Sequence, residues 1–223
     1  PPKSVEAINL LTCANGVPQN EYQVANGNFE AGISPSGEIP GWEKEGDIGN
    51  ISYDYLWWNE WYTFNKEGLY FFSGFAGNEG ATGTLTSSAF TVGGSGMMTY
   101  RLGGGMDNEL CYLEVVDADN PQVVYYRFGN ERFTTKGGVF IGYPITVGCE
   151  GFGANMTLYK ADISPLTGKR VKLRLTDYAV KDWGLLFADD FVTYYENKED
   201  VPQSAVPATN LLPVPEFKSG EYT

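Results

Sequence analysis

One stretch, Val171-Lys172-Leu173-Arg174-Leu175-Thr176, alternates apolar and polar side chains, a pattern typical of a β-strand with one buried face. The run Phe191-Val192-Thr193-Tyr194-Tyr195 is rich in β-branched and aromatic residues, so it predicts a second strand. The loop between them presents Asp177, Asp182 and Trp183. Two carboxylates beside an indole suit a sugar, because they accept hydroxyl hydrogen bonds while the flat ring covers the apolar side of the sugar. The alternative is that Trp183 plugs the end of the sheet and the two acids are solvated turn residues.

The composition extends this interpretation to the whole chain. The 223 residues include 28 glycines, and aromatic residues make up 15% of the sequence. Short strand-like segments follow one another at regular intervals, separated by glycine-containing turns, and no apolar run has helical spacing. The sequence therefore predicts an all-β fold, an antiparallel β-sandwich of the jelly-roll type with loop-rich ends.

Charge and cysteine content exclude several functions. The formal net charge is −13 with no basic cluster, which disfavours nucleic acid as a partner. Histidine is absent, so the commonest general base and transition-metal ligand are missing. The three cysteines allow at most one internal disulfide and match no zinc pattern, and Cys111 lies in a strand-like run, which favours a buried apolar role. No apolar run approaches the about 20 residues that span a membrane.

Changes in composition along the chain predict three segments. Residues 1–25 are polar and weakly patterned and are interpreted as a leader or linker, whereas residues 26–196 form the β-sandwich. Residues 197–223 are acidic and proline-rich and are interpreted as a linker. The chain begins at Pro1 with no signal peptide, which predicts a piece excised from a longer polypeptide.

Several segments across roughly residues 26–195 have a specific order and spacing. They are Asn26-Gly27-Asn28-Phe29-Glu30, Trp57-Trp58, Phe64-Asn65-Lys66-Glu67-Gly68, Glu79 to Ser88, Gly93 to Gly96, Arg101 to Gly105, and Asp177 through Trp183-Gly184 to Asp189-Asp190. Together they resemble the family 66 carbohydrate-binding modules, β-sandwiches that are often attached to fructan-degrading enzymes of glycoside hydrolase family 32. The resemblance implies a non-catalytic module that recognises the terminal fructosyl unit of levan or a related fructan and targets an attached catalytic domain to it. It also implies a secreted or cell-surface location in bacteria.

The resemblance also implies which residues bind the sugar. These are Glu79, Arg101, Asp177, Asp182 and Trp183, from three separate loops expected to meet at one end of the sandwich. The carboxylates would accept paired hydroxyl hydrogen bonds and the guanidinium would donate in a fixed fork. Each acid is open to the alternative of a solvated turn, and Arg101 to that of a salt-bridge partner.

A structural calcium ion is a further implication of the resemblance. Glu30 from the first strand and Asp190 from the last would meet where the chain ends come together, with backbone carbonyls completing the shell. Calcium takes six to eight oxygen ligands, so hard carboxylates beside irregular backbone suit it. The alternative is that Asp189 and Asp190 only place charge at the edge of a sheet.

Two other functions stay open. A hydrolase could use two carboxylates as acid and nucleophile, although no catalytic motif or nucleophile elbow is present. A structural or adhesive β-sandwich domain of a secreted multidomain protein, with other or no glycan binding, is the alternative to the fructan module.

Overall fold

The structure is a computed structural model, and it describes residues 21–53, 56–57, 60–61, 64–132, 155–181 and 183–213. Fourteen strands and two short 3₁₀ helices make up its regular elements, and the described part contains no α-helix. The elements are β1 (Trp42–Gly46), β2 (Asn50–Ser52), β3 (Leu56–Trp57), β4 (Glu60–Trp61), β5 (Phe71–Ser73), β6 (Gly83–Ser87), β7 (Phe90–Thr91), β8 (Met97–Gly104), β9 (Cys111–Asp117), β10 (Val124–Phe128), β11 (Thr157–Asp162), η3 (Ser164–Leu166), β12 (Arg170–Asp177), β13 (Leu186–Val192), η4 (Lys198–Asp200) and β14 (Val206–Pro207).

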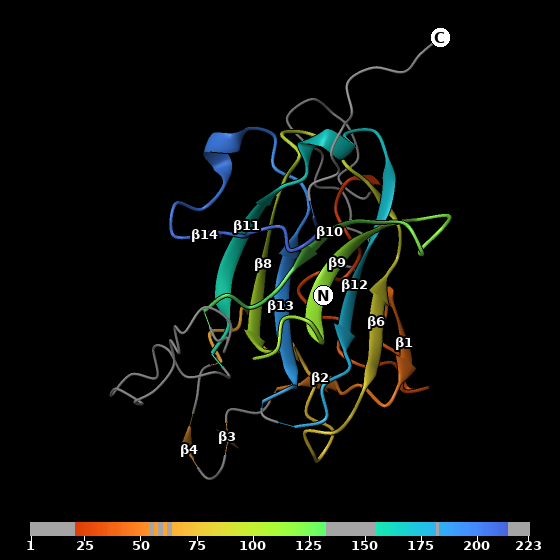
Figure 1. The fold of residues 1–223 in the computed structure, drawn as a ribbon, viewed down its shortest axis with the longest axis vertical. Coiled ribbons are helices and arrows are strands. Elements are labelled where there is room, and N and C mark those ends of the chain that lie inside the picture. Colours follow the sequence, from red (N-terminus) through yellow and green to blue (C-terminus); the bar gives the residue numbers. More distant parts are fainter. Residues whose placement is uncertain are drawn as a thin grey trace, which may run out of the picture.

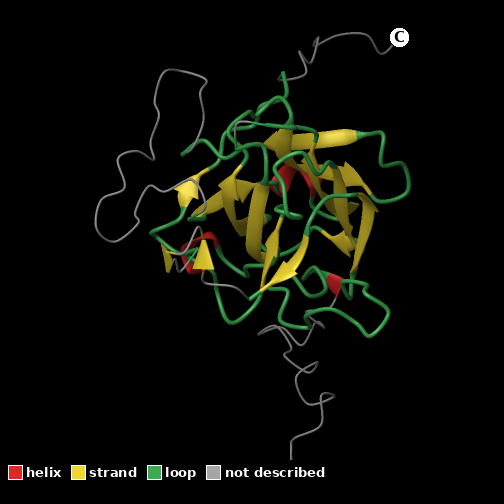
Figure 2. Cartoon of the chain, turned by 90° about the horizontal axis from the view of Figure 1, so that it is seen from below, coloured by secondary structure: helices red, strands yellow, loops and turns green. Residues whose placement is uncertain are grey.

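Two six-stranded sheets form the layers of a sandwich (Figures 1 and 2). Sheet 1 has the strand order β1-β6-β12-β9-β10, with β7 also paired to β12. Sheet 2 has the order β14-β11-β8-β13-β5-β2. Every pair within the sheets is antiparallel except β11 with β14. The predicted antiparallel β-sandwich is confirmed.

The core lies between the sheets and follows from the alternation in the sequence. In β12, Val171, Leu173 and Leu175 are fully buried, as the period-two pattern predicts. They belong to the same apolar cluster as Tyr100 and Leu102 of β8 in the opposite sheet. Because strand side chains alternate between faces, this burial sends the intervening polar residues of β12 to the outer surface of sheet 1.

The turn residues 117–121, Asp-Ala-Asp-Asn-Pro, join β9 and β10 in an antiparallel hairpin. The carboxylate of Asp117 stabilises the turn, because its Oδ1 accepts the N–H groups of Asp119 and Asn120 at 3.0 and 2.9 Å. The Tyr125 hydroxyl donates to its Oδ2 at 2.7 Å. These contacts lower the pKa of Asp117 below its usual value, the Tyr125 hydrogen bond contributing most.

A second apolar cluster covers part of the outer face of sheet 2. Trp183, half-buried and with a left-handed backbone (φ 59°), packs against this cluster. The indole predicted to stack on a sugar therefore has an apolar protein environment. The buried members are Phe64, Phe71, Met156, Leu185 and Phe187.

The domain extends beyond the predicted range 26–196 at its N-terminal side. Val24 is buried in the core, and its N–H donates to Thr193 Oγ1 at 2.8 Å. The Gln23 carboxamide contacts the same strand end, because its Oε1 accepts the Thr193 N–H at 2.9 Å. These two residues carry little hydrophobic pattern, so their role in holding the end of β13 is not visible in the sequence.

The predicted C-terminal linker also begins later than the sequence suggests. Val201 and Ala205 are buried, and β14 pairs with β11. Ala208 N–H then donates to Lys160 O at 2.8 Å. Backbone hydrogen bonds and two small apolar side chains hold this segment, which explains why its composition resembles a linker.

Candidate functional site

An open groove lies on the outer face of sheet 1, and the strand register defines its floor. Glu43 pairs across β1 and β6 with Thr86, and Thr86 pairs with Arg174 of β12. Arg174 pairs in turn with Glu114 of β9, and Glu114 with Arg127 of β10. One row of five polar side chains therefore crosses five strands, each directly opposite the next. All five line a groove of about 600 Å³, within the about 300–1,000 Å³ typical of ligand sites.

A second row runs beside the first. Glu45, Thr84, Thr176 and Tyr112 are paired across β1, β6, β12 and β9, and all four line the groove. The two rows are two residues apart along each strand, which corresponds to about 7 Å. Tyr178, whose exposure is 53%, follows at this end of the groove. The floor thus combines carboxylates, hydroxyls, guanidinium groups and aromatic rings on rigid strands.

A buried carboxylate holds the centre of the floor. Glu114 has a side-chain exposure of 2%, and each of its oxygens accepts two hydrogen bonds from one arginine. Arg127 donates to Oε1 through Nε at 3.1 Å and Nη2 at 2.8 Å. Arg174 donates to Oε2 through Nε at 2.9 Å and Nη2 at 2.7 Å. Such paired bidentate contacts fix both guanidinium planes.

The arginines are also held by neighbouring groups. The Arg127 guanidinium lies 4.1 Å from the centroid of the Tyr112 ring, a cation–π contact. Arg174 Nη1 donates to the carbonyl of Pro121 in the β9–β10 turn at 3.1 Å. Burial is the largest cause that raises the pKa of Tyr112, so its hydroxyl stays protonated at neutral pH and available as donor and acceptor.

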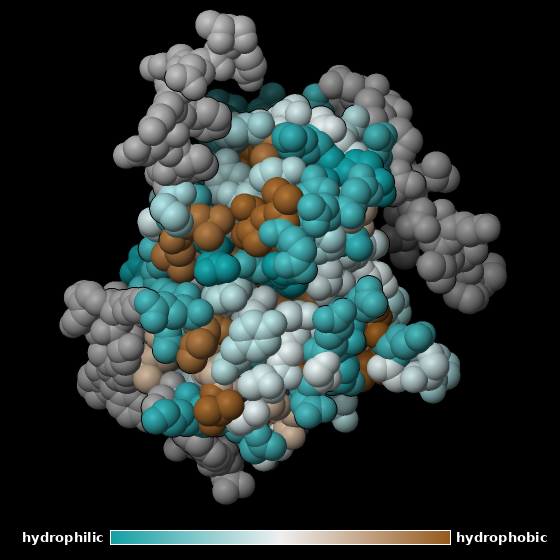
Figure 3. Space-filling model, turned by 45° about the vertical axis from the view of Figure 1, so that its right-hand side comes forward, coloured by the Kyte–Doolittle hydropathy of each residue, from teal (hydrophilic) through white to brown (hydrophobic). Residues whose placement is uncertain are grey.

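The surface on the side of β1 and β6 is mostly hydrophilic, and its hydrophobic side chains form small separate patches (Figure 3). A polar floor with paired donors and acceptors matches a ligand that carries many hydroxyl groups, because each buried polar atom on both partners must be satisfied. Burial of a purely apolar ligand would leave the exposed carboxylates of Glu43 and Glu45 without partners.

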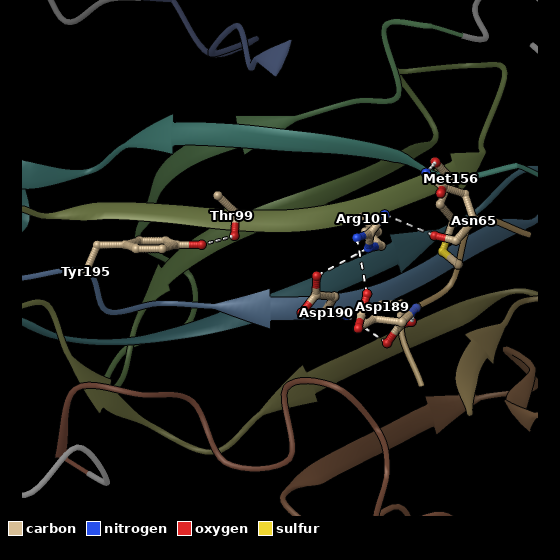
Figure 4. Close-up of polar contacts among 8 residues, drawn as sticks. Asn65, Thr99, Arg101, Met156, Asp189, Asp190 and Tyr195 are labelled. Atoms are coloured by element: carbon tan, nitrogen blue, oxygen red, sulfur yellow. Dashed lines mark hydrogen bonds and ion pairs between the residues drawn. The ribbon is translucent and has the colours of Figure 1, made fainter. Parts of the chain in front are cut away.

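The structure places the predicted sugar-binding residues that it describes at more than one position. Glu79 and Trp183 are neighbours, since the backbone N–H of Trp183 donates to Glu79 Oε2 at 3.4 Å. Arg101 lies on the outer face of sheet 2, where its Nε donates to Asp190 at 3.2 Å and its Nη1 to Asn65 O at 3.2 Å (Figure 4). The alternative stated for Arg101, that it is a salt-bridge partner, therefore agrees with the structure.

Asp177 lies at the end of β12 with an exposure of 0%. Its Oδ1 accepts the Cys111 thiol at 3.4 Å and the Ala179 N–H at 3.2 Å. Its Oδ2 is buried without a hydrogen-bond partner in the described part of the chain. Burial raises the pKa of Asp177 to about 7. A ligand has no access to this carboxylate, so its role here is structural. Asp182, the remaining predicted residue, lies outside the described residues.

Of the two predicted calcium ligands, Glu30 contacts the loop of residues 64–70. Glu30 Oε1 accepts the N–H groups of Leu69 and Tyr70, both at 2.8 Å. Asp190 is instead paired with Arg101. Carboxylates suit calcium chemically, yet the described residues include no group of three or more acidic, cysteine or histidine side chains that could hold a metal ion. The calcium site stays a prediction.

Asp189, next to the predicted ligand, is fully buried. Its Oδ2 accepts the Glu67 N–H at 2.7 Å and its Oδ1 accepts the Asp190 N–H at 2.7 Å. Burial is the largest cause that raises the pKa of Asp189, to about 7. This side chain, rather than Asp190, is the carboxylate that hydrogen-bonds β13 to the loop of residues 64–70.

The groove residues were missed by the sequence analysis for an identifiable reason. In the sequence, Lys172, Arg174 and Thr176 are the polar positions of a half-buried strand, a pattern that predicts exposure to solvent and nothing more. The available signal was Glu114, a lone acid within the apolar run of residues 110–116. A charge inside such a run needs partners, and the outward arginines of neighbouring strands are the residues that can supply them.

Fold and groove together define a β-sandwich domain with an open polar groove on one sheet. No family model and no curated protein matches the chain. Solved structures that resemble it include three adhesin domains of Lys-gingipain. The K3 domain, from Porphyromonas gingivalis W83, has 18% identity and a TM-score of 0.42, over 76% of this chain and 97% of that domain. The K2 domain has 16% identity and a TM-score of 0.47, over 78% of this chain and 97% of that domain. The K1 domain, from the same strain as K3, has 14% identity and a TM-score of 0.42, over 74% of this chain and 94% of that domain. Likenesses this distant carry no inference about function.

The described residues contain no helix that is long and apolar enough to cross a membrane.

Proposed function

We propose that this chain is a non-catalytic binding module that holds a carbohydrate chain in the groove of sheet 1. The observation that carries the proposal is the row Glu43–Thr86–Arg174–Glu114–Arg127, which sets acceptors, a hydroxyl and fixed donors side by side on five paired strands. Vicinal hydroxyls of a sugar both donate and accept, so this sequence of groups offers partners for several of them at once. Side chains on strands need little reordering when a ligand binds, which favours affinity.

A binding role suits the groove better than catalysis. Both oxygens of its central carboxylate, Glu114, are occupied by arginine N–H groups. A general acid or nucleophile needs a carboxyl oxygen free to reach the scissile bond. The hydrolase alternative is tested in the same experiments by following the release of reducing ends.

The proposal agrees with the adhesive alternative where that domain binds another glycan, because attachment to a glycan on a surface is adhesion through the same groove. A structural or adhesive domain with no glycan binding is a separate alternative. Terminal fructosyl recognition of levan or a related fructan, and an attached fructan-degrading catalytic domain, remain proposals that rest on the resemblance alone. The same holds for a secreted or cell-surface location in bacteria.

The test is a glycan array followed by isothermal titration with the polymers it selects, with levan and inulin included. Tyr112→Ala removes a ring from the groove floor, and Glu79→Ala is the matched control at the loop site. Loss of binding in the first variant alone supports the groove. Loss of binding in the Glu79 variant alone would place the binding site in the loops. If the original chain binds no glycan, the proposal is wrong.

We also propose, from the resemblance, that a calcium ion stabilises the region between Glu30 and the loop of residues 64–70. The support is that the Glu30 carboxylate already contacts two backbone N–H groups of that loop. Thermal unfolding measured in EDTA and in excess calcium should then differ by several degrees, and Glu30→Gln should abolish the difference. Identical melting curves in both conditions would count against the metal.

A further inference from the structure

The distribution of positive charge over the molecule is uneven in a way that the carbohydrate proposal alone does not explain. The chain has 28 acidic and 15 basic side chains. Three of the basic ones, Arg127, Arg174 and Lys172, line the single groove described above. A protein with this negative balance repels anions in general, so a local group of cations marks the place where an anion can bind.

The basic half of the groove keeps an excess of positive charge after its internal pairs are counted. Glu114 is shared by two arginines, so these three side chains together carry a charge of +1. Lys172 lies two residues from Arg174 on the same face of β12, and its side chain makes no hydrogen bond or ion pair with the residues that the structure describes. It adds a second positive charge.

The two acids on the opposite side of the groove do not neutralise this half. Glu43 and Glu45 are exposed on β1, which is separated from β12 by β6. Two strand spacings amount to about 10 Å, and the screening length at physiological salt is about 8 Å. The groove is therefore divided into an acidic side at β1 and a basic side from β12 to β10.

The basic side also has donors to spare. Arg127 uses Nε and Nη2 for Glu114, and no hydrogen bond of its Nη1 occurs within the described part of the chain. Its side chain is 31% exposed and that of Arg174 is 21% exposed. The Glu114 and Tyr112 contacts hold the Arg127 plane in place, so its remaining N–H groups stay available as donors on the basic side of the groove.

We infer that the ligand is an acidic carbohydrate, with negatively charged substituents bound separately by Lys172 and by Arg127 on the basic side of the groove, and the hydroxyls of a neighbouring sugar bound by Thr86 and Glu43. This inference rests on the proposed function and narrows it to a ligand class. A carboxylate and a sulfate ester share the chemistry that these cations recognise, and the experiment distinguishes them.

The test is isothermal titration with a short oligogalacturonate, with its neutral methyl ester, and with a sulfated galacto-oligosaccharide. Short ligands avoid long-range repulsion by the rest of the acidic surface. The free acid or the sulfate ester should bind and the methyl ester should bind more weakly, and the tighter of the two anions identifies the group. Lys172→Gln should weaken binding of the anion about two- to fivefold, the range for one exposed ion pair.

Lys160→Gln, on β11 of sheet 2, is the matched control and should leave binding unchanged. If the methyl ester binds as tightly as the acid, or if both lysine variants bind like the original chain, the inference is overturned while the carbohydrate proposal stands. Failure of all three ligands together with every glycan on the array removes the proposed function itself.

Discussion

Replacement of Asp177 by asparagine should stabilise the protein at alkaline pH and leave its stability almost unchanged near pH 4. The carboxyl group is fully buried, and burial raises its pKa from 3.8 to about 7. Between these values the folded chain binds a proton that the unfolded chain has released. The stability that this proton confers is complete below pH 3.8 and is lost as the pH rises through 7.

The magnitude follows from the pKa difference. About three units at about 1.4 kcal/mol each give about 4 kcal/mol of unfolding free energy. Asparagine keeps an oxygen for the Cys111 thiol and the Ala179 N–H but carries no charge at any pH. At pH 8 the unfolding free energy of the variant should therefore be up to about 4 kcal/mol higher than that of the original chain. This corresponds to a melting temperature about 8–16 °C higher.

Urea unfolding at several pH values between 4 and 8 measures the difference between the two chains, and Asp119→Asn, at an exposed turn position, is the control. A difference that grows with pH for Asp177 alone supports the buried assignment. A variant that is less stable than the original chain at pH 8 would refute the reasoning, because it would mean that the native structure uses the charge.

Three other changes test the groove and the core. Glu114→Gln should lower the unfolding free energy by about 2–3 kcal/mol, since the two half-exposed guanidinium groups lose the charge they share; a loss below about 0.5 kcal/mol in urea unfolding would show that the ion pairs are not formed. Gly83→Ala should destabilise the pairing of β1 with β6, because its Cβ would lie 2.0 Å from a backbone oxygen of Glu45. Gly37→Ala is the control, because a Cβ at Gly37 has no neighbour within 4 Å and the substitution therefore adds only the strain of a positive φ. Equal melting temperatures of the two variants would argue against the clash at Gly83. Burial raises the pKa of the Cys111 thiol well above its usual value, so iodoacetamide at pH 8 should label it only after unfolding, as peptide mapping by mass spectrometry would show; rapid labelling of the folded chain would contradict its burial.

The sequence was sufficient to predict the layers of the sandwich because burial leaves a direct trace in the pattern of a strand. The alternation in β12 identified which side chains enter the core, and the turn residues 117–121 identified the β9–β10 hairpin. Both signals are local, since they depend on neighbours within one strand or one turn.

The groove could not be predicted in the same way because its residues come from five strands. Glu43, Thr86 and Arg127 lie far apart in the sequence and become neighbours only through the strand order and register. Pairing between distant strands leaves no periodic signal in a single chain. Asp177 was not predictable for a different reason. An acid at the end of a strand suggests a surface position, whereas here the carboxylate is buried and accepts hydrogen bonds inside the core.

The most direct test of the groove is chemical-shift mapping of the isotope-labelled protein with the glycan that binds best. If the glycan binds in the groove, the largest changes should fall on the backbone amides of Tyr112, Glu114 and Arg127 and on their neighbours in β6 and β12. Changes confined to the loops around Glu79 and Trp183, with the outer face of sheet 1 unaffected, would contradict it.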